Sequence, residues 1–414
     1  MYYVIIDPNL DYALYMVEFL GRHGYRAIAV FTAAHEYHAY RHMSYERIKH
    51  WVADEFLIPE HPSLEALAYR IRQEVPGELV AIIPWAELTI LVGAQLGAAL
   101  GLDWNPPEVI RCFRNKFAMK EALRRAGGAR INASRVVSSV EDAADFVQQV
   151  RRWPIVVKPT ESAGSNAVSF VNSMEELVSA AQKVFHAGAG EILLEEFIGG
   201  EEFVVNGITD TFGRLLVTDV WRYDKRDVGP HKNLYHQTIS VKSHEPEWRP
   251  LAQYATQVVH ALKLRKAPVH MEVKIDAFGP CMIEVGARFA GGNQPALAGQ
   301  MHGRSLFELA ACHYVADGKI SWDDVNYERY NQHHARIISG VQTQHLQRVS
   351  GLHGYAEVQQ LPSFSSFGKL IPPGGMVPVT TDLLSKCYEV YLFHHDPEQI
   401  AYDAQRVRNL LHYY

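Results

Sequence analysis

The 414-residue chain contains only four cysteines and has no excess of positive charge. The cysteines are scattered and no two of them form a CxxC pair, which excludes a cysteine zinc site and is typical of a reducing compartment, so we expect a cytoplasmic protein. The formal net charge is −6 without a basic block, so no nucleic-acid partner is expected. The longest apolar stretch, residues 88–100, is too short to cross a bilayer, so we expect no membrane association.

The chain also lacks the two familiar phosphate-binding motifs. GxxxxGK[ST] does not occur, and the turn after the first expected strand, residues 7–9, does not contain GxGxxG, so neither standard nucleotide fold is supported. No Ser-His-Asp or Cys-His signature supports a hydrolase. His35, His38 and His42 have near-helical spacing, but their Glu, Tyr and Arg neighbours favour a polar helix face over a zinc site.

Residues 1–100 alternate short apolar runs with amphipathic stretches. This alternation predicts an open parallel sheet flanked by helices, which is a Rossmann-like α/β domain. The expected strands are 3–6, 27–31 and 79–83, and the expected helices are 11–23, 64–74 and 88–100. From residue 153 onward the sequence is richer in strand patterns, so the fold class is predicted as α/β and α+β, with several domains.

A first candidate nucleotide site follows the β-branched strand that ends at Lys158. The next residues are small and polar, and Ser162, Gly164 and Ser165 would let backbone N–H groups approach phosphate oxygens. The alternative interpretation is a surface hairpin with a solvated lysine. A second candidate is residues 194–203, where the backbone of residues 196–198 could pair a purine edge and the Glu202 carboxylate could bind ribose hydroxyls. Its alternative is a charged hairpin at the surface.

The strongest pattern is a hairpin over residues 270–288. A three-residue turn at 277–279 would place Glu272 directly opposite Glu284. Two facing carboxylates repel each other unless a cation or a shared proton lies between them. Oxygen ligands without Cys or His suit Mg²⁺, with Mn²⁺ as a second option, and Arg288 would add positive charge nearby. The alternative is a charge-rich hairpin in another register.

Taken in order, these segments resemble the ATP-grasp superfamily, most clearly between residues 105 and 292. The resemblance implies an ATP-grasp fold with four units: an N-terminal α/β domain at 1–110, a small subdomain with a phosphate-covering loop at 111–190, a large subdomain with the catalytic site at 191–330, and a C-terminal α+β region at 331–414 that completes the large domain. The residues matching family positions are Lys116 and Lys158 for phosphate, Glu195, Glu196, Phe197 and Ile198 for the adenine hinge, Glu202 for ribose, Glu272 and Glu284 for Mg²⁺, and Arg288 at the reacting centre.

Within the superfamily, residues 83–87, 102–108 and 283–292 are similar to L-amino-acid ligases. This resemblance implies substrate contacts at Glu87, Lys225, His231, His236 and Gly291. Gly286 stands where the family usually has a metal-binding Asn, so the sequence leaves open whether one or two Mg²⁺ ions bind.

The function that the resemblance implies is an ATP-dependent carboxylate–amine ligase. It would form an amide, such as a dipeptide, from a small carboxylate and an amine through an acyl phosphate, with release of ADP and phosphate. The alternatives are another ATP-grasp chemistry, namely a purine-pathway ligase or a carboxylase, and a non-catalytic ATP-binding regulator. A homodimer is compatible with the apolar 88–100 stretch, but burial of that stretch in the N-terminal core explains it equally well.

Overall fold

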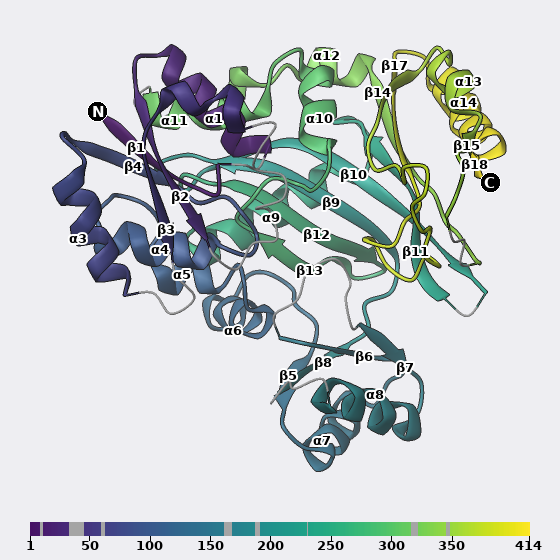
Figure 1. Ribbon diagram of the computed structural model, residues 1–414. Coiled ribbons are helices and arrows are strands. Elements are labelled where there is room, and N and C mark those ends of the chain that lie inside the picture. Colours follow the sequence, from purple (N-terminus) through teal and green to yellow (C-terminus); the bar gives the residue numbers. More distant parts are fainter. Residues whose placement is uncertain are drawn as a thin grey trace.

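The computed structural model describes residues 1–8, 11–32, 45–58, 63–160, 168–186, 191–229, 231–315, 322–344 and 348–414. Within these ranges the strands form two four-stranded sheets, one eight-stranded sheet and one two-stranded pair. Figure 1 shows a small lobe standing away from the rest of the molecule. No helix in these ranges is long and apolar enough to span a membrane.

The N-terminal sheet is parallel, as the alternating sequence pattern predicts, and its strand order is β3-β2-β1-β4. Val4, Ile5 and Ile6 of β1 are fully buried, as expected for a strand inside a parallel sheet. The edge strand β3 was not predicted because Asp54 and Glu55 interrupt its apolar pattern. The elements are β1 (Tyr2–Ile6), α1 (Asp11–Arg22), β2 (Arg26–Thr32), η2 (Tyr45–Arg47), η3 (Lys49–Trp51), β3 (Val52–Ile58), α3 (Leu64–Glu74), β4 (Leu79–Ile83), α4 (Ile90–Ala99) and α5 (Pro107–Arg111).

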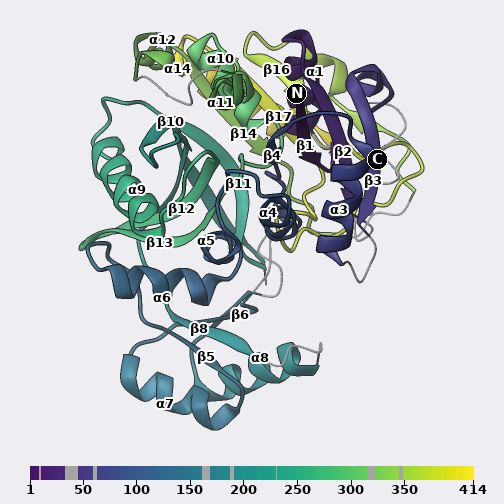
Figure 2. The same ribbon diagram turned by 90° about the vertical axis from the view of Figure 1, so that its left-hand side faces the viewer.

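The small lobe is an antiparallel sheet of order β5-β8-β6-β7 with its own apolar core. Its two helices cover the sheet on the side away from the rest of the molecule (Figures 1 and 2). Phe146 and Leu177 from these helices are buried against Ile155 and Val157 of β6. The elements are β5 (Ser134–Val137), α7 (Val140–Val150), β6 (Ile155–Lys158), β7 (Ser169–Val171), α8 (Met174–His186) and β8 (Ile192–Glu196).

The eight-stranded sheet has the order β13-β12-β9-β10-β11-β14-β17-β16. It therefore joins the strands after residue 200 to strands from the C-terminal region. The elements are α6 (Lys116–Ala126), β9 (Glu201–Thr209), β10 (Leu215–Val228), β11 (His231–Val241), α9 (Trp248–Leu262), β12 (Pro268–Asp276), β13 (Gly279–Gly286), α10 (Gln294–His302), α11 (Leu306–Val315), η4 (Trp322–Asp324), α12 (Tyr327–Gln332), β14 (His334–Ser339), β16 (Phe364–Phe367) and β17 (Glu389–His394).

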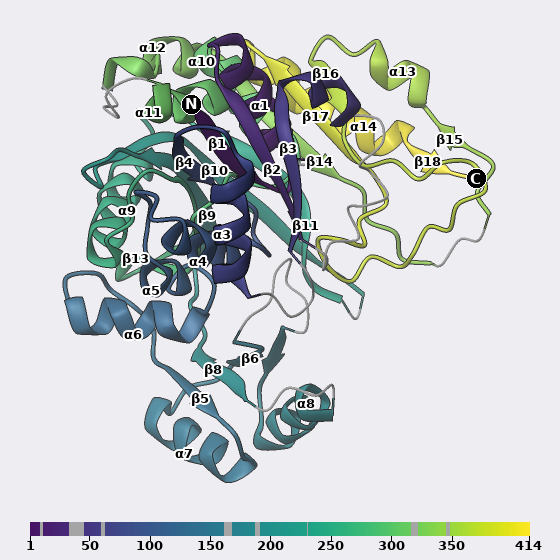
Figure 3. The ribbon, with the colours of Figure 1, turned by 60° about the vertical axis from the view of Figure 1, so that its left-hand side comes forward.

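The N-terminal sheet and the eight-stranded sheet share one continuous apolar core, in which Trp85, Trp221 and Tyr330 are among the largest buried side chains. A second core lies under the C-terminal helices, on the opposite side from the N-terminal sheet in Figure 1. Figure 3 shows the C-terminal elements beside strands β14, β16 and β17. These elements are β15 (Leu352–His353), α13 (Tyr355–Gln359), α14 (Pro397–Leu410) and β18 (His412–Tyr413).

One strand pairs outside the predicted unit that contains its residues. β8 completes the small sheet, although its residues lie in the predicted large subdomain. β14, β16 and β17 continue the eight-stranded sheet, so the C-terminal region shares the sheet that carries the site. The predicted domain limits themselves stay a prediction.

Candidate active site

A cavity of about 630 Å³ lies between the small lobe, the eight-stranded sheet and the C-terminal strands. Most of the described residues that the sequence singled out line this cavity: Glu87, Lys116, Lys158, Glu195, Glu196, Phe197, Ile198, Glu202, Lys225, Glu272, Glu284, Arg288 and Gly291. Ser162, Gly164 and Ser165, and the three histidines near residue 40, lie outside the described residues. The cavity therefore brings residues from four regions of the chain to one place.

Two predicted substrate residues, His231 and His236, do not line the cavity. His231 pairs with Val228 at the end of the β10–β11 hairpin. The pairing register shifts between Asp224 and Lys225, which leaves His236 as an extra residue on β11, and its Nδ1 lies 3.4 Å from Asp224 Oδ2. The contacts in the structure therefore give the predicted substrate roles of these two histidines no support.

Glu195 is buried between two lysines at the junction of the small lobe and helix α6. Its Oε1 lies 2.8 Å from Lys120 Nζ, and its Oε2 lies 3.0 Å from Lys158 Nζ. Burial alone would raise the pKa of Glu195, but the two lysines outweigh burial and lower this pKa from 4.5 to about 2. Glu195 is therefore an ionised carboxylate that holds two buried ammonium groups in place.

Lys120 is a site residue that the sequence analysis missed. Its side chain is fully buried, and burial lowers the pKa of its ammonium despite the attraction of Glu195. The signal was available, because Lys116 and Lys120 lie four residues apart on α6 and so share one face of that helix. Lys116 itself pairs with Glu284, at 2.9 Å between Nζ and Oε2. Helix α6 thus points two lysines at the cavity region.

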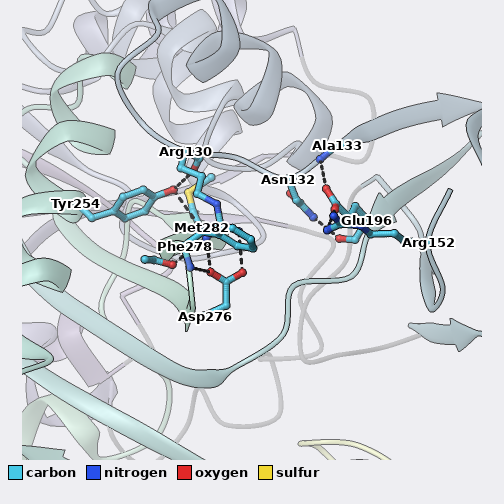
Figure 4. Close-up of polar contacts among 10 residues, drawn as sticks. Arg130, Asn132, Ala133, Arg152, Glu196, Tyr254, Asp276, Phe278 and Met282 are labelled. Carbon is cyan, nitrogen blue, oxygen red and sulfur yellow. Dashed lines mark hydrogen bonds and ion pairs between the residues drawn. The ribbon is translucent and has the colours of Figure 1, made fainter. Parts of the chain in front are cut away.

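Glu196 belongs to the predicted adenine hinge and is the last residue of β8, where the chain leaves the small lobe. Asn132 Nδ2 donates to the Glu196 carbonyl at 2.7 Å, and the Glu196 N–H donates to the Ala133 carbonyl at 2.9 Å. Figure 4 shows the Glu196 side chain facing Ala133 and Arg152. These bonds join the two strands that connect the small lobe to the rest of the protein, and so they fix the backbone at the predicted hinge.

Arg130 anchors the segment through which the chain enters the small lobe before β5. Its guanidinium donates to both Asp276 oxygens, at 2.8 and 2.7 Å, and to the Gly279 carbonyl. Tyr254 Oη donates to the Arg130 carbonyl and accepts from the Met282 N–H, as Figure 4 shows. A bidentate arginine–carboxylate pair has a defined geometry. The entry to the small lobe is therefore held against the β12–β13 hairpin.

The predicted ribose acid, Glu202, pairs with Lys225, whose Nζ lies 2.5 Å from Glu202 Oε1. Lys225 also lies over the rings of Tyr235 and Tyr223, at 4.2 and 5.2 Å from the ring centroids. Burial would lower the pKa of Lys225, but Glu202 and Glu272 outweigh burial and raise it. Lys225 is therefore a fixed cation between the predicted ribose acid and the predicted metal acids.

Glu272 and Glu284 face each other across the β12–β13 hairpin, as the sequence predicted. The turn that produces this register differs from the predicted turn. Asp276 pairs with Gly279, so the turn is shorter than expected, and a bulge between Glu272 and Val273 restores the pairing. The bulge leaves Ile283 as an extra residue on β13, and Ile283 and Glu284 both line the cavity. Bulges commonly redirect side chains beside active sites in this way.

The electrostatics of this pair fit a divalent cation. Burial and the nearby Glu284 carboxylate raise the pKa of Glu272 from 4.5 to about 8, so the two acids do not both ionise readily without a cation between them. Both are oxygen donors beside a cavity large enough for a nucleotide, and Mg²⁺ commonly binds one or two carboxylates together with phosphate oxygens and water. The donor set therefore suits Mg²⁺, and Mn²⁺ has similar ligands.

Arg288 is held by Glu87, which comes from the N-terminal domain after β4. Arg288 Nε and Arg114 Nη1 donate to the two oxygens of Glu87. Burial would raise the pKa of Glu87, but Arg288 and Arg114 lower it, so this carboxylate stays ionised. A Cβ atom on Gly286 would lie 3.2 Å from Arg288 Cγ and 3.4 Å from Glu87 Oε2. Gly286 therefore leaves the space that the arginine–glutamate pair occupies.

One end of the cavity is formed by residues late in the sequence, and the sequence analysis did not predict this end. It is lined by residues that follow Arg288 and by residues of the C-terminal region, namely Phe289, Gly292, Gln294, Ser339, Lys369, Leu383, Leu384, Lys386 and Glu389. Lys386 Nζ and Tyr391 Oη both donate to Glu389. No motif in the sequence pointed to the lining residues beyond 292, because they come together only when β14, β16 and β17 join the eight-stranded sheet.

Comparisons with known proteins agree with this arrangement. Residues 151–295 match the family model described as an ATP-grasp domain. The chain carries an ATP-grasp domain. This match confirms the resemblance drawn from the sequence, and ATP-grasp enzymes use ATP with a divalent metal, generally Mg²⁺.

Relatives that match most of the chain are named as a synthase and a ligase. The chain is 25% identical over 353 residues to dapdiamide A synthase of Enterobacter agglomerans, covering 82% of this chain and 81% of the relative. It is 22% identical over 271 residues to the L-arginine-specific L-amino acid ligase of Bacillus subtilis, covering 63% of each. The crystal structure of an L-amino acid ligase from Bacillus licheniformis aligns with a TM-score of 0.78 at 20% identity, over 100% of this chain and 98% of that one. This likeness of fold and the family match together establish the ATP-grasp fold.

Proposed function

We propose that this protein is an ATP-dependent carboxylate–amine ligase that joins amino acids or related small acids and amines into an amide. The observation that carries the proposal is the convergence of the facing acids Glu272 and Glu284, with Lys116 paired to Glu284, beside Arg288 in one cavity. Phosphoryl transfer is catalysed mainly by positioning and by neutralising charge, and these groups supply both. The named relatives support the amide-forming class.

In this proposal the nucleotide occupies the half of the cavity near the small lobe. The hinge at residues 196–198 pairs the adenine, Glu202 binds the ribose hydroxyls, and Lys116 and Lys158 neutralise phosphate oxygens. Glu272 and Glu284 would hold Mg²⁺, which when bound neutralises charge on the β and γ phosphates. The resulting two-acid site fits the pairing and the raised pKa of Glu272.

The chemistry then proceeds in two displacements. An oxygen of the substrate carboxylate attacks the γ phosphorus, ADP leaves, and an acyl phosphate forms. The amine nitrogen attacks the acyl carbon, loses a proton, and expels inorganic phosphate, which leaves the amide. Arg288 stabilises the negative charge that develops on the acyl oxygen, and Glu87 with Arg114 holds the guanidinium in place.

The test is ADP and phosphate formation from ATP and Mg²⁺ across a matrix of paired amino acids, with mass spectrometry of each positive pair. We expect phosphate only when both substrates are present, and a product mass equal to their sum minus water. A requirement for bicarbonate instead of a second amino acid would identify a carboxylase. Nucleotide binding without ADP formation from any pair, or with bicarbonate, would identify a non-catalytic ATP-binding protein and overturn the proposal.

A further inference from the structure

The end of the cavity that is lined by residues after Arg288 and by the C-terminal region contains hydrogen-bond donors that its own acceptors do not satisfy. Glu389, the one carboxylate among the described lining residues at this end, already accepts from Lys386 and Tyr391. Lys369 lines the same end, and its Nζ donates to the Leu384 carbonyl at 2.5 Å but makes no ion pair in the described part of the chain. Burial and the neighbouring Lys386 lower the pKa of Lys369, and the Asp382 and Glu389 carboxylates only partly offset this lowering. This end is therefore short of negative charge.

Gln294 is an independent sign of a missing ligand. Its side chain lines the cavity, the residue is 4% exposed, and its buried Nε2 has no hydrogen-bond partner in the described structure. An amide N–H that is buried without a partner destabilises the fold. Such a donor persists at a binding site because a ligand oxygen satisfies it.

Gln294 is also the first residue of α10, and the start of this helix favours an anion. The N-cap residue Asn293 makes no side-chain bond to the first-turn N–H groups, because its amide donates to Ser366 Oγ at 3.4 Å. The Asn293 N–H is held by Tyr391 Oη at 2.9 Å, which ties the start of the helix to β17. Uncapped N–H groups and the helix dipole both attract carboxylates.

From these observations we propose that Gln294, Lys369 and the start of α10 form a subsite for a second substrate carboxylate, one that is not activated by ATP. The proposal rests on the proposed ligase function and names its substrate class. One substrate would carry an acid group besides the reacting groups. It would be either an amine substrate with a free carboxylate, such as an α-amino acid, or a dicarboxylic acid as the carboxylate substrate. Leu383 and Leu384 line the same end and would contact the apolar part of that molecule.

The subsite can be tested by binding, without turnover. Calorimetry on the full chain with Mg²⁺ and a non-hydrolysable ATP analogue would compare L-amino acids with their α-amides, and succinate with succinamate. The variants are Gln294→Leu and Lys369→Met. Their controls are Gln300→Leu, an exposed glutamine of the same helix, and Lys49→Met, an exposed lysine of the N-terminal domain. Two separate variants keep the test valid if one of them fails to fold.

We expect the free acid of one of the two comparisons to bind more tightly than its amide. Either variant should weaken that binding roughly tenfold to hundredfold, while both controls and the affinity for the ATP analogue stay unchanged. A preference for amino acids over their amides would place the carboxylate on the amine substrate, and a preference for succinate would place it on the other substrate. Acid binding that both variants leave intact, or no binding in either comparison, would overturn the subsite.

Turnover separates this inference from the proposed function. If amide products form equally well from acids and amides in the wild-type protein and in both variants, the subsite is wrong and the ligase function stands. If acid-selective binding depends on Gln294 and Lys369 but no substrate pair produces ADP, the subsite stands and the ligase function is wrong.

Discussion

Arg288 contacts Glu87 and lines the cavity, so its charge is held in one place before any substrate binds. Because the guanidinium is expected to stabilise an oxyanion that forms only during the reaction, Arg288→Ala should lower kcat about 10²- to 10³-fold and change the apparent affinity for ATP by only a few-fold. Steady-state kinetics with varied ATP would measure both values. Equal losses in kcat and in ATP affinity would contradict this role.

Glu195 makes stability depend on pH. Its pKa is lowered from 4.5 to about 2, so its ionised form stabilises the fold fully above pH 4.5 and this stabilisation is lost as the pH falls toward 2. Glu195→Gln removes the partner of two buried lysines and should cost about 3–5 kcal/mol at neutral pH. Urea unfolding from pH 6 to pH 2 should therefore show a weaker pH dependence in the variant than in the wild type.

The control for this prediction is Glu196→Gln. Glu196 pairs with the largely exposed Arg152 at 3.6 Å, and exposed ion pairs contribute about 1 kcal/mol or less. If both variants lose the same stability with the same pH dependence, the buried lysine pair is not the cause.

Among single residues, the sequence predicted those whose role can be inferred from their spacing to nearby residues in the chain. Glu272 and Glu284 could be paired by counting from the hairpin turn, and the structure places them opposite each other. Lys120 and Gln294 were missed, because a lysine on an amphipathic helix and a glutamine near a Gly-Gly pair have ordinary explanations. Lys120 shares a helix face with Lys116, but its complete burial and the unpaired amide of Gln294 depend on the complete fold.

At the scale of elements, the end of β13 determines how much room the reacting centre has. Asn at position 286 would restore the residue usual for the family, but its Cβ would press against Arg288 and Glu87. Gly286→Asn should therefore displace the guanidinium and lower kcat on the order of 10²-fold, instead of adding a useful metal ligand. Kinetics at varied Mg²⁺ concentration would measure this.

A glycine with open space around it provides the control. A Cβ atom on Gly199 would meet nothing within 4 Å, so Gly199→Ala should keep near wild-type turnover. Higher kcat in Gly286→Asn, or a second Mg²⁺ dependence with unchanged kcat, would show that the space around Arg288 is not limiting.

The register of the β12–β13 hairpin could be predicted from the sequence, but the bulge that produces this register could not. The expected longer turn and the observed shorter turn with a bulge lead to the same Glu272–Glu284 pair. A bulge has no dependable sequence signature, since it reflects how β12 and β13 twist against β9 and the helices behind them. A bulge on β11 likewise leaves His236 as an extra residue beside Asp224, and no pattern in the sequence indicated it.

At the scale of the whole molecule, the N-terminal parallel sheet could be predicted, and so could the lining residues of the half of the cavity that we propose binds the nucleotide, since both depend on patterns within short segments. The substrate half could not, because it forms where C-terminal strands extend the eight-stranded sheet and bring Lys369 and Glu389 beside α10. The two halves meet in one cavity, with Glu272, Glu284 and Arg288 among its lining residues. This arrangement is what a carboxylate activated by ATP and then captured by an amine requires.

The most direct test of carboxylate activation follows an oxygen atom. A substrate labelled with ¹⁸O in its reacting carboxylate should, during turnover with ATP and Mg²⁺, transfer one labelled oxygen to inorganic phosphate, because the carboxylate oxygen that attacks the γ phosphorus leaves with it. Mass spectrometry of the phosphate and of the amide would measure the transfer. The account predicts one label in phosphate, together with ADP. Unlabelled phosphate, or label found in AMP, would contradict it.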